Sequence, residues 1–194
     1  MKRSLFVLIT IVGVALLAAS CGGGAAKDHN ARDVSFAQEM IPHHRQAVEM
    51  ADLAATRASD QKVKALAAQI KAAQDPEIQT MTGWLTSWGE PVTASAGGGG
   101  MAGHSMGGSS GSTGAMGMMT DAEMTTLQGS SGVAFDRQFL TMMTGHHNGA
   151  IEMAQDQLDK GKFEPAKQLA ASIRDSQQKE VAEMQRILAA LPTT

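Results

Sequence analysis

Histidine is concentrated in two short stretches of this chain. Only six histidines occur among 194 residues, and four of them lie in PHHRQAVEMA (residues 42–51) and GHHNGAIEMA (residues 145–154). Imidazole is a common metal ligand and changes its charge near neutral pH. Two His-His pairs therefore predict a metal site or a buried polar cluster, if the fold brings them together.

The two stretches belong to a longer internal repeat. The offset of 103 residues that takes His43 to His146 holds without a gap between residues 33–88 and residues 136–191. Each copy has apolar residues at helical spacing with one break, in the first copy near residues 58–60, which predicts a helical hairpin. One hairpin buries its apolar stripes poorly, whereas two packed together form a four-helix bundle. Identical pairs at this offset include Asp33/Asp136, Phe36/Phe139, Met40/Met143, Ala47/Ala150, Glu49/Glu152, Leu66/Leu169, Ile70/Ile173, Met81/Met184 and Leu85/Leu188.

Composition agrees with this architecture. The chain is 43% hydrophobic but only 4% aromatic, with no Tyr, which suits helices and disfavours β-sandwiches and barrels. We expect an all-α fold in one domain, a ferritin-like four-helix bundle built from two repeated helical hairpins.

The N-terminus has the pattern of an export signal. Lys2 and Arg3 precede an apolar run from Leu5 to Ala19, which is too short for a typical spanning helix. The run ends at Cys21 in a context that resembles a bacterial lipobox. We expect residues 1–20 to be a signal peptide and Cys21, the only cysteine, to carry a lipid that anchors the protein outside the cytoplasm; the alternative is a plain signal peptide. Without residues 1–20 the chain has 14 basic and 19 acidic residues, so nucleic acid is not an expected partner.

The remaining segments follow from composition. We expect a tether at residues 21–32, hairpins at residues 33–93 and 133–191, and a mobile Gly-, Met- and His-rich linker at residues 94–119. Residues 120–132 are predicted to hold a short helix and a connection, because Thr120 and Glu123 have the spacing of a capping box.

Helical geometry predicts a polar layer inside the bundle. His43 lies in the middle of its apolar stripe, His44 lies at the border, and Glu49 faces solvent. Counting along both helices from the turn places Glu77 at the level of His43. The predicted layer comprises His43, His44, Gln74 and Glu77, with His146, His147, Gln177 and Glu180 from the second copy.

Two interpretations of this layer remain open, because buried polar groups are unfavourable unless each finds a partner. In the first, His–Glu pairs satisfy each other and fix the register of the bundle. In the second, the imidazoles bind a metal, and Glu77 and Glu180 orient them by accepting the other ring N–H. The flanking methionines are ordinary packing residues by themselves, but imidazole with thioether favours copper. Pro42, Gly145 and Pro76 predict helices that kink or loosen beside the layer.

The linker is a second candidate metal site. Thioethers bind soft cations such as Cu(I) or Ag(I) without deprotonation, although a merely solvated linker is also consistent with the sequence. The residues concerned are Met101, His104, Met106, Met116, Met118 and Met119.

The repeated motifs resemble a known bacterial family. The pattern Phe-x3-Met-x2-His-His-x2-Ala-(Val/Ile)-Glu-Met-Ala occurs at residues 36–51 and 139–154, and Gln-x2-Glu-(Ile/Val)-x2-Met at residues 74–81 and 177–184. Both are similar to the family named domain of unknown function 305. This resemblance implies a ferritin-like bundle in an exported protein, and some relatives are associated with copper binding and resistance. The ligands that it implies are His43, His44, His146, His147, Met40, Met50, Met143 and Met153.

Enzymatic functions find less support. A ferritin-type di-iron site needs several inward carboxylates and Glu-x-x-His pairs; the chain has no Glu-x-x-His, and only Glu77 and Glu180 are expected to face inward. No serine or cysteine carries an activating motif. We therefore expect a copper-binding or copper-buffering lipoprotein without catalysis, with a metal-free structural or partner-binding bundle and a redox-active metalloprotein as the alternatives.

Overall fold

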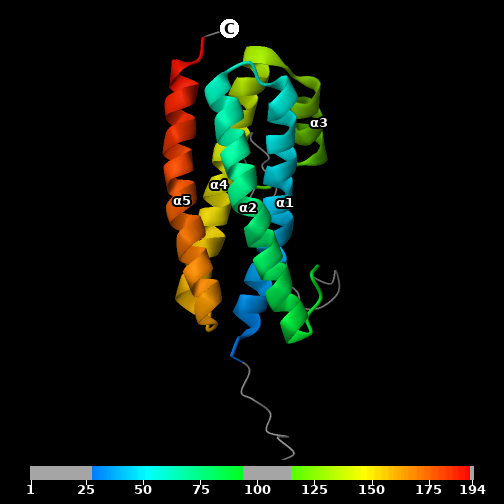
Figure 1. Cartoon of the computed structure of the whole chain (residues 1–194), viewed down its shortest axis with the longest axis vertical. Coiled ribbons are helices and arrows are strands. Elements are labelled where there is room, and N and C mark those ends of the chain that lie inside the picture. Colours follow the sequence, from blue (N-terminus) through cyan, green and yellow to red (C-terminus); the bar gives the residue numbers. More distant parts are fainter. Residues whose placement is uncertain (1–27, 94–114, 193–194) are drawn as a thin grey trace, which may run out of the picture.

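The structure, a computed structural model, describes residues 28–93 and 115–192, and it contains helices and no β-strand within those ranges. Four long helices form a bundle, and a short helix lies beside its upper half (Figure 1). This confirms the predicted all-α bundle of two helical hairpins. The elements are α1 (Ala31–Arg57), α2 (Gln61–Trp88), the short 3₁₀ element η1 (Ala115–Gly117), α3 (Asp121–Gly129), α4 (Gly132–Lys160) and α5 (Glu164–Ala190).

Some predictions concern parts of the chain outside the described ranges. These are the signal peptide at residues 1–20, the lipidation of Cys21, and the linker residues Met101, His104 and Met106. Among the residues that are described, no helix is both long and apolar enough to cross a membrane.

The first hairpin is fastened to the second by a buried carboxylate near the start of α1. Asp33 is fully buried and accepts hydrogen bonds from the backbone N–H groups of Lys162 (3.1 Å) and Phe163 (3.1 Å), in the turn between α4 and α5. The Gln157 side chain donates a third at 2.6 Å. The same carboxylate closes a capping box with Asn30. Asp33 thus joins the start of one repeat to the turn of the other.

The second repeat makes the reciprocal connection. Asp136, also fully buried, accepts hydrogen bonds from the backbone N–H groups of Ser59 (3.1 Å) and Asp60 (2.9 Å), in the turn between α1 and α2. The Ser59 hydroxyl donates to it as well. The expectation that Glu77 and Glu180 alone would face inward is therefore wrong, because Asp33 and Asp136 are more deeply buried than either and serve the turns, not the centre.

The helices continue through both prolines. Pro42 lies inside α1 and Pro76 inside α2, and neither helix is interrupted there. Both prolines are exposed, so the backbone hydrogen bond that each one removes lies toward solvent, where water can replace it. The helices that were predicted to kink or loosen are therefore continuous at both prolines.

The hydrophobic core is divided into two clusters. One cluster is centred on Phe135, Phe139 and Leu127 and lies toward the α1–α2 turn, and the other is centred on Phe36, Leu85 and Ile173. Met50, Met143 and Met184 belong to the first cluster, whereas Met40, Met81 and Met153 belong to the second. The histidines lie between the two clusters, since His43 and His44 fall between Ile41 and Ala47 along α1.

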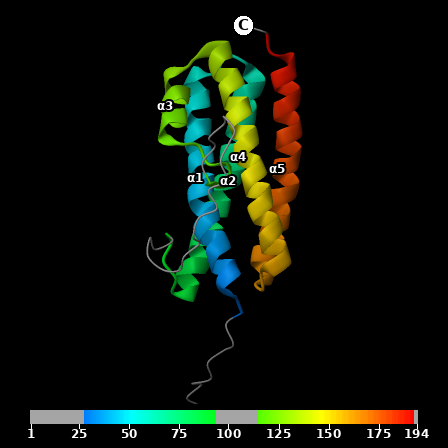
Figure 2. The same ribbon diagram turned by 180° about the vertical axis from the view of Figure 1, so that it is seen from behind.

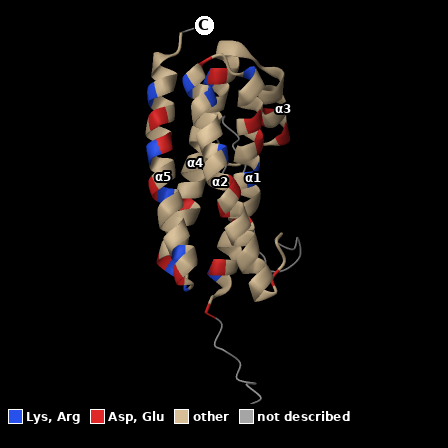
Figure 3. Cartoon of the chain, in the orientation of Figure 1, with Lys and Arg blue, Asp and Glu red and all other residues tan. Residues whose placement is uncertain are grey.

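The packing of the helices places α1 and α4 at the centre. These two helices contact each other extensively, whereas α2 and α5 contact each other less. The reverse view shows the chain before α3 crossing α1 toward α4 (Figure 2). Acidic and basic residues are interspersed along the outer face of α5 (Figure 3), so this view shows no strongly basic face.

Candidate metal site

Four imidazoles meet at the middle of the bundle. His44, His146 and His147 have no exposed surface and His43 is 1% exposed. The rings of His43 and His146 lie against each other across the α1–α4 contact, with centroids 3.7 Å apart and planes tilted by 36°. The repeat predicted that both His-His pairs would reach one level, and the structure brings them together there.

The second histidine of each pair contacts a carboxylate on the neighbouring helix of its own hairpin. His44 Nε2 lies 2.7 Å from Glu77 Oε2, and His147 Nε2 lies 2.8 Å from Glu180 Oε2. The sequence placed Glu77 at the level of His43, but it contacts His44. Consecutive helical residues point about 100° apart, so His43 faces α4 while His44 faces α2. His44 is therefore buried and not at the border of the apolar stripe.

These contacts fix which ring nitrogen keeps a free lone pair. An ionised carboxylate only accepts hydrogen bonds, so His44 and His147 carry their proton on Nε2 when neutral. His43 Nε2 likewise donates to the Met116 backbone carbonyl at 3.0 Å. The Nδ1 atoms of all four histidines are buried without a hydrogen-bond partner, and so is Nε2 of His146. The site thus presents several unpaired imidazole nitrogens that are shielded from solvent.

Burial holds the central pair neutral. It lowers the pKa of His43 from 6.5 to about 3. The hydrogen bond to Met116 raises this pKa, whereas the neighbouring His44 and His147 lower it further. Burial also lowers the pKa of His146 well below its ordinary value, with His43 as the next contribution. Neutral imidazole is the form that binds metals, so protons compete weakly for these two rings near neutral pH.

The other predicted residues of the layer are also buried. Gln74 is 2% exposed and Gln177 3%, and the Oε1 atom of each has no hydrogen-bond partner. Glu49 is exposed, as expected. The candidate thioether ligands Met40, Met50, Met143 and Met153 are at most 1% exposed and lie in the two clusters that flank the histidines.

The side chains do not form a finished carboxylate or imidazole site. Within residues 28–93 and 115–192, no group of three or more His, Cys, Asp or Glu side chains is positioned to hold a metal ion. A metal at this level would therefore need the rings to turn on their χ angles or a thioether to complete the ligand set. Orphaned buried nitrogens beside methionines fit a soft ion of low coordination number better than a hard ion that needs six oxygens.

The last part of the predicted linker packs onto the site. Residues 115–119, called the strap below, contact α4 through η1 and accept the hydrogen bond from His43 through Met116. The last residues of the predicted linker are thus placed against α4. Met116 is 45% exposed, Met118 is half-buried and Met119 is 5% exposed, so the three thioethers lie in different environments.

A signal for the strap was present in the sequence but was not interpreted. The two copies of the His-His motif differ at Gln46, whose counterpart is Gly149, and at Pro42, whose counterpart is Gly145. Gly145 and Gly149 lie one helical turn apart on α4 and contact the strap backbone. Glycines at that spacing on a buried helix indicate close approach of another backbone. The prediction of a mobile linker did not take this signal into account.

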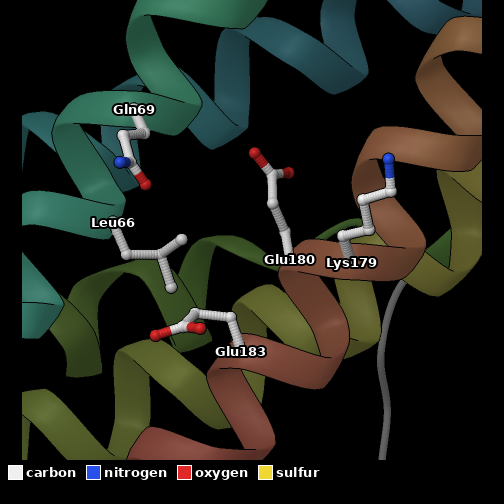
Figure 4. Close-up of a pocket in the computed structure, with 5 residues that line it drawn as sticks. All are labelled: Leu66, Gln69, Lys179, Glu180 and Glu183. Atoms are coloured by element: carbon white, nitrogen blue, oxygen red, sulfur yellow. The ribbon is translucent and has the colours of Figure 1, made fainter.

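Glu180 is reached from outside through an open groove between α2 and α5. The groove has a volume of about 350 Å³ and is lined by Leu66, Gln69, Lys179, Glu180 and Glu183. Figure 4 shows Glu180 and Glu183 directed from α5 toward the α2 side. Because Glu180 lines the groove and also contacts His147 Nε2, it connects the groove to the buried histidine, whereas Glu183 pairs with Arg186.

The fold and this layer define a four-helix bundle with a buried cluster of imidazoles. The chain belongs to the DUF305 family, a domain of unknown function, whose model matches residues 33–188. This agrees with the resemblance found in the repeated motifs. The chain matches none of the curated proteins.

Solved structures of this family resemble the chain over most of its length. A DUF305 protein of Streptomyces coelicolor, named as a candidate secreted protein, is 32% identical, with a TM-score of 0.71 over 82% of this chain and 91% of that one. A DUF305 fragment from Deinococcus radiodurans is 29% identical, with a TM-score of 0.69 over 84% and 98%. CopM in its Cu(II)-bound form is 30% identical, with a TM-score of 0.66 over 81% and 96%. CopM structures also include Cu(I)-bound and Ag-bound forms.

Proposed function

We propose that this protein binds or buffers a soft transition-metal ion, most specifically copper, in the histidine layer of its bundle, and that it does so without catalysis. The observation that carries the proposal is the set of unpaired buried nitrogens on His43, His44, His146 and His147. Each such nitrogen is unfavourable in a dry interior unless a ligand satisfies it.

The surroundings of the histidines support this function. Glu77 and Glu180 hold the Nε2–H of His44 and His147, which is how outer carboxylates commonly orient metal-binding imidazoles. The pair His43 and His146 would supply the first ligands of a soft ion, since their rings are closest together. Met40, Met50, Met143 and Met153 are the candidate thioether ligands. The binding of copper and silver by CopM, a structural relative, agrees with this choice of metal.

The alternative to metal binding is a structural role for the histidine layer, which the histidine–glutamate pairs favour. The His44–Glu77 and His147–Glu180 pairs already satisfy part of the layer, and no group of three or more described His, Cys, Asp or Glu side chains is positioned for a metal. In that case the layer would fix the register of the helices and bind nothing. A redox-active metal centre, the remaining alternative, would additionally require turnover with oxygen or peroxide.

We further propose that the protein acts outside the cytoplasm as a lipoprotein. The sequence pattern around Cys21 and the Streptomyces coelicolor relative named as a candidate secreted protein support this location. Incorporation of radiolabelled palmitate into the wild-type protein but not into a Cys21→Ala variant, expressed in a bacterial host, would test the anchor.

Metal titration of the full chain in detergent tests the proposed function. Cu(I), held by a competing chromophoric chelator, should bind stoichiometrically to the wild type and bind much more weakly to His43→Ala and His146→Ala. His29→Ala is the matched control, because His29 stacks on Trp88 far from the layer. Deletion of residues 97–113 removes most of the linker but keeps the strap. Binding lost only in that deletion would move the site to the linker, and no binding at all would favour the structural role.

A further inference from the structure

The central histidines are sealed from solvent. His43 is 1% exposed and His146 is fully buried, so an ion reaches them only if a covering element moves. The elements that contact this pair include α1, α4 and the strap of residues 115–119. The two helices carry most of the hydrophobic core, whereas the strap contributes one buried side chain, Met119, and otherwise contacts the helices through its backbone.

The strap lies directly against the backbone of α4. A Cβ atom on Gly149 would lie 1.8 Å from the Met116 carbonyl oxygen, and a Cβ atom on Gly117 would lie 2.6 Å from the Gly145 carbonyl oxygen. A Cβ atom essentially never lies so close to a carbonyl oxygen to which it is not bonded, so Gly149 cannot be replaced while the strap stays in place. Gly117 also has φ +80°, a conformation that favours glycine.

Few interactions fasten the strap to α1. The Gln46 side chain donates to the Met119 carbonyl at 2.8 Å and accepts from the Met119 N–H at 2.6 Å. His43 Nε2 donates to the Met116 carbonyl at 3.0 Å. Three hydrogen bonds and the buried Met119 side chain therefore hold a segment that covers two deeply buried rings.

The strap also contains a strained residue with an exposed thioether. Met116 has φ 59° and is the only non-glycine residue with positive φ in the described part of the chain. Such a conformation persists only where its surroundings impose it, and lifting the strap would release it. Its side chain is 45% exposed, the most exposed large hydrophobic side chain among the described residues. A soft ion arriving from solvent would meet this thioether beside the histidines.

The positions that fasten the strap are among those at which the repeats differ. Gln46 and Gly149 occupy equivalent places in the two copies, and so do Pro42 and Gly145. Gln46 bonds to the strap from α1, while Gly149 and Gly145 make room for it on α4. The duplication has thus diverged at the positions that seat a single strap.

From these contacts we infer that the strap is a gate: residues 115–119 lift while the bundle stays folded, and this opening admits a soft monovalent ion of the Cu(I) or Ag(I) class to His43 and His146. The inference rests on the proposed function. Met119 and Gln46 are the latch, and the Met116 carbonyl leaves His43 Nε2 when the gate opens.

Histidine accessibility tests the gate without any metal. The full chain is treated with diethyl pyrocarbonate, which modifies accessible neutral imidazole, and modified peptides are quantified by mass spectrometry. Gly149→Ala should increase the modification rates of His43 and His146 at least about tenfold. This is the order expected when the two hydrogen bonds between Gln46 and Met119 are lost. The unfolding midpoint in urea should stay near that of the wild type. His44 and His147, held by their carboxylates, should remain protected. Gly83→Ala is the matched control, because it adds a methyl group to a helix where nothing lies within 4 Å.

Gln46→Ala provides a second route to an open gate if Gly149→Ala does not fold. It removes both bonds to Met119 and leaves α4 unchanged. Wild-type modification rates at His43 and His146 in the folded variants would overturn the inference. So would modification that rises only in step with global unfolding.

Silver uptake separates this inference from the proposed function. Ag(I) in chloride-free buffer is followed by competition with a chromophoric chelator, and both variants should take it up faster than the wild type. If the wild type binds no Ag(I) or Cu(I), the proposed function fails, while the modification rates still report whether the strap opens. Binding at equal rates in the wild type and in both variants would contradict the gate and leave the proposed function standing.

Discussion

The rings of His43 and His146 lie 3.7 Å apart, centroid to centroid, where α1 and α4 cross. Each comes from the same position of its repeat, so the duplication itself produces the pair. A single ion bound between the two rings would depend on both of them at once.

This geometry predicts that the two histidines act as a unit. His43→Ala and His146→Ala should each reduce Cu(I) affinity by at least about tenfold, and the double variant should lose little more than either single variant, because ligands of one ion are strongly non-additive. Competition titration at fixed chelator concentration measures the three affinities. Independent, additive losses would mean that the two rings do not share one ion.

The contacts of His44 and His147 with their carboxylates lead to a second prediction. Glu77→Ala and Glu180→Ala should each weaken metal binding by about 10–100-fold, the usual effect of removing the group that orients a metal-binding imidazole. Glu77→Gln should cost less, because its amide oxygen can still accept from His44 Nε2. The measurement is the same competition titration. Glu152→Ala, at an exposed position on α4, should have no effect, and a comparable loss there would contradict the assignment.

The bundle and the level of the histidines were predictable because they depend on periodicity alone. The ungapped repeat required His43 and His146 to occupy equivalent places, and the apolar stripe placed them inward. The partner of Glu77 was not predictable from a count of residues, because the helix level does not determine which neighbour a side chain faces. The burial of Asp33 and Asp136 was not predicted either, because each carboxylate binds a turn that lies about 75 to 130 residues away in the sequence. The strap was missed because its attachment, apart from the buried Met119 side chain, uses backbone groups, which leave no mark in its own sequence except glycine.

The reciprocal aspartates predict a loss of stability that is separate from metal binding. Asp136→Ala would leave the backbone N–H groups of Ser59 and Asp60 without their acceptor. At about 1.5–3 kcal/mol for each hydrogen bond to a charged group, the loss of these two bonds should lower the unfolding free energy by roughly 3–6 kcal/mol. Urea denaturation followed by far-UV circular dichroism measures this change. Asp121→Ala, at the exposed start of α3, should change the unfolding free energy far less, and equal losses would show that the buried hydrogen bonds are not the cause.

Asp33 predicts the behaviour of the fold in acid. Burial alone would raise the pKa of its carboxyl, but the hydrogen bonds donated to it outweigh burial and lower the pKa below its ordinary value. The folded state then binds this proton less readily than the unfolded chain, whose aspartates titrate near pH 4. The stabilisation is therefore complete above about pH 4 and is lost as the pH falls through the lower pKa of the folded state. Urea midpoints measured from pH 6 down to pH 3 should fall more steeply for the wild type than for Asp33→Asn. The variant is less stable at pH 6, but it has no carboxyl to protonate at this position. Parallel curves for the two proteins would mean that Asp33 does not contribute to the acid sensitivity.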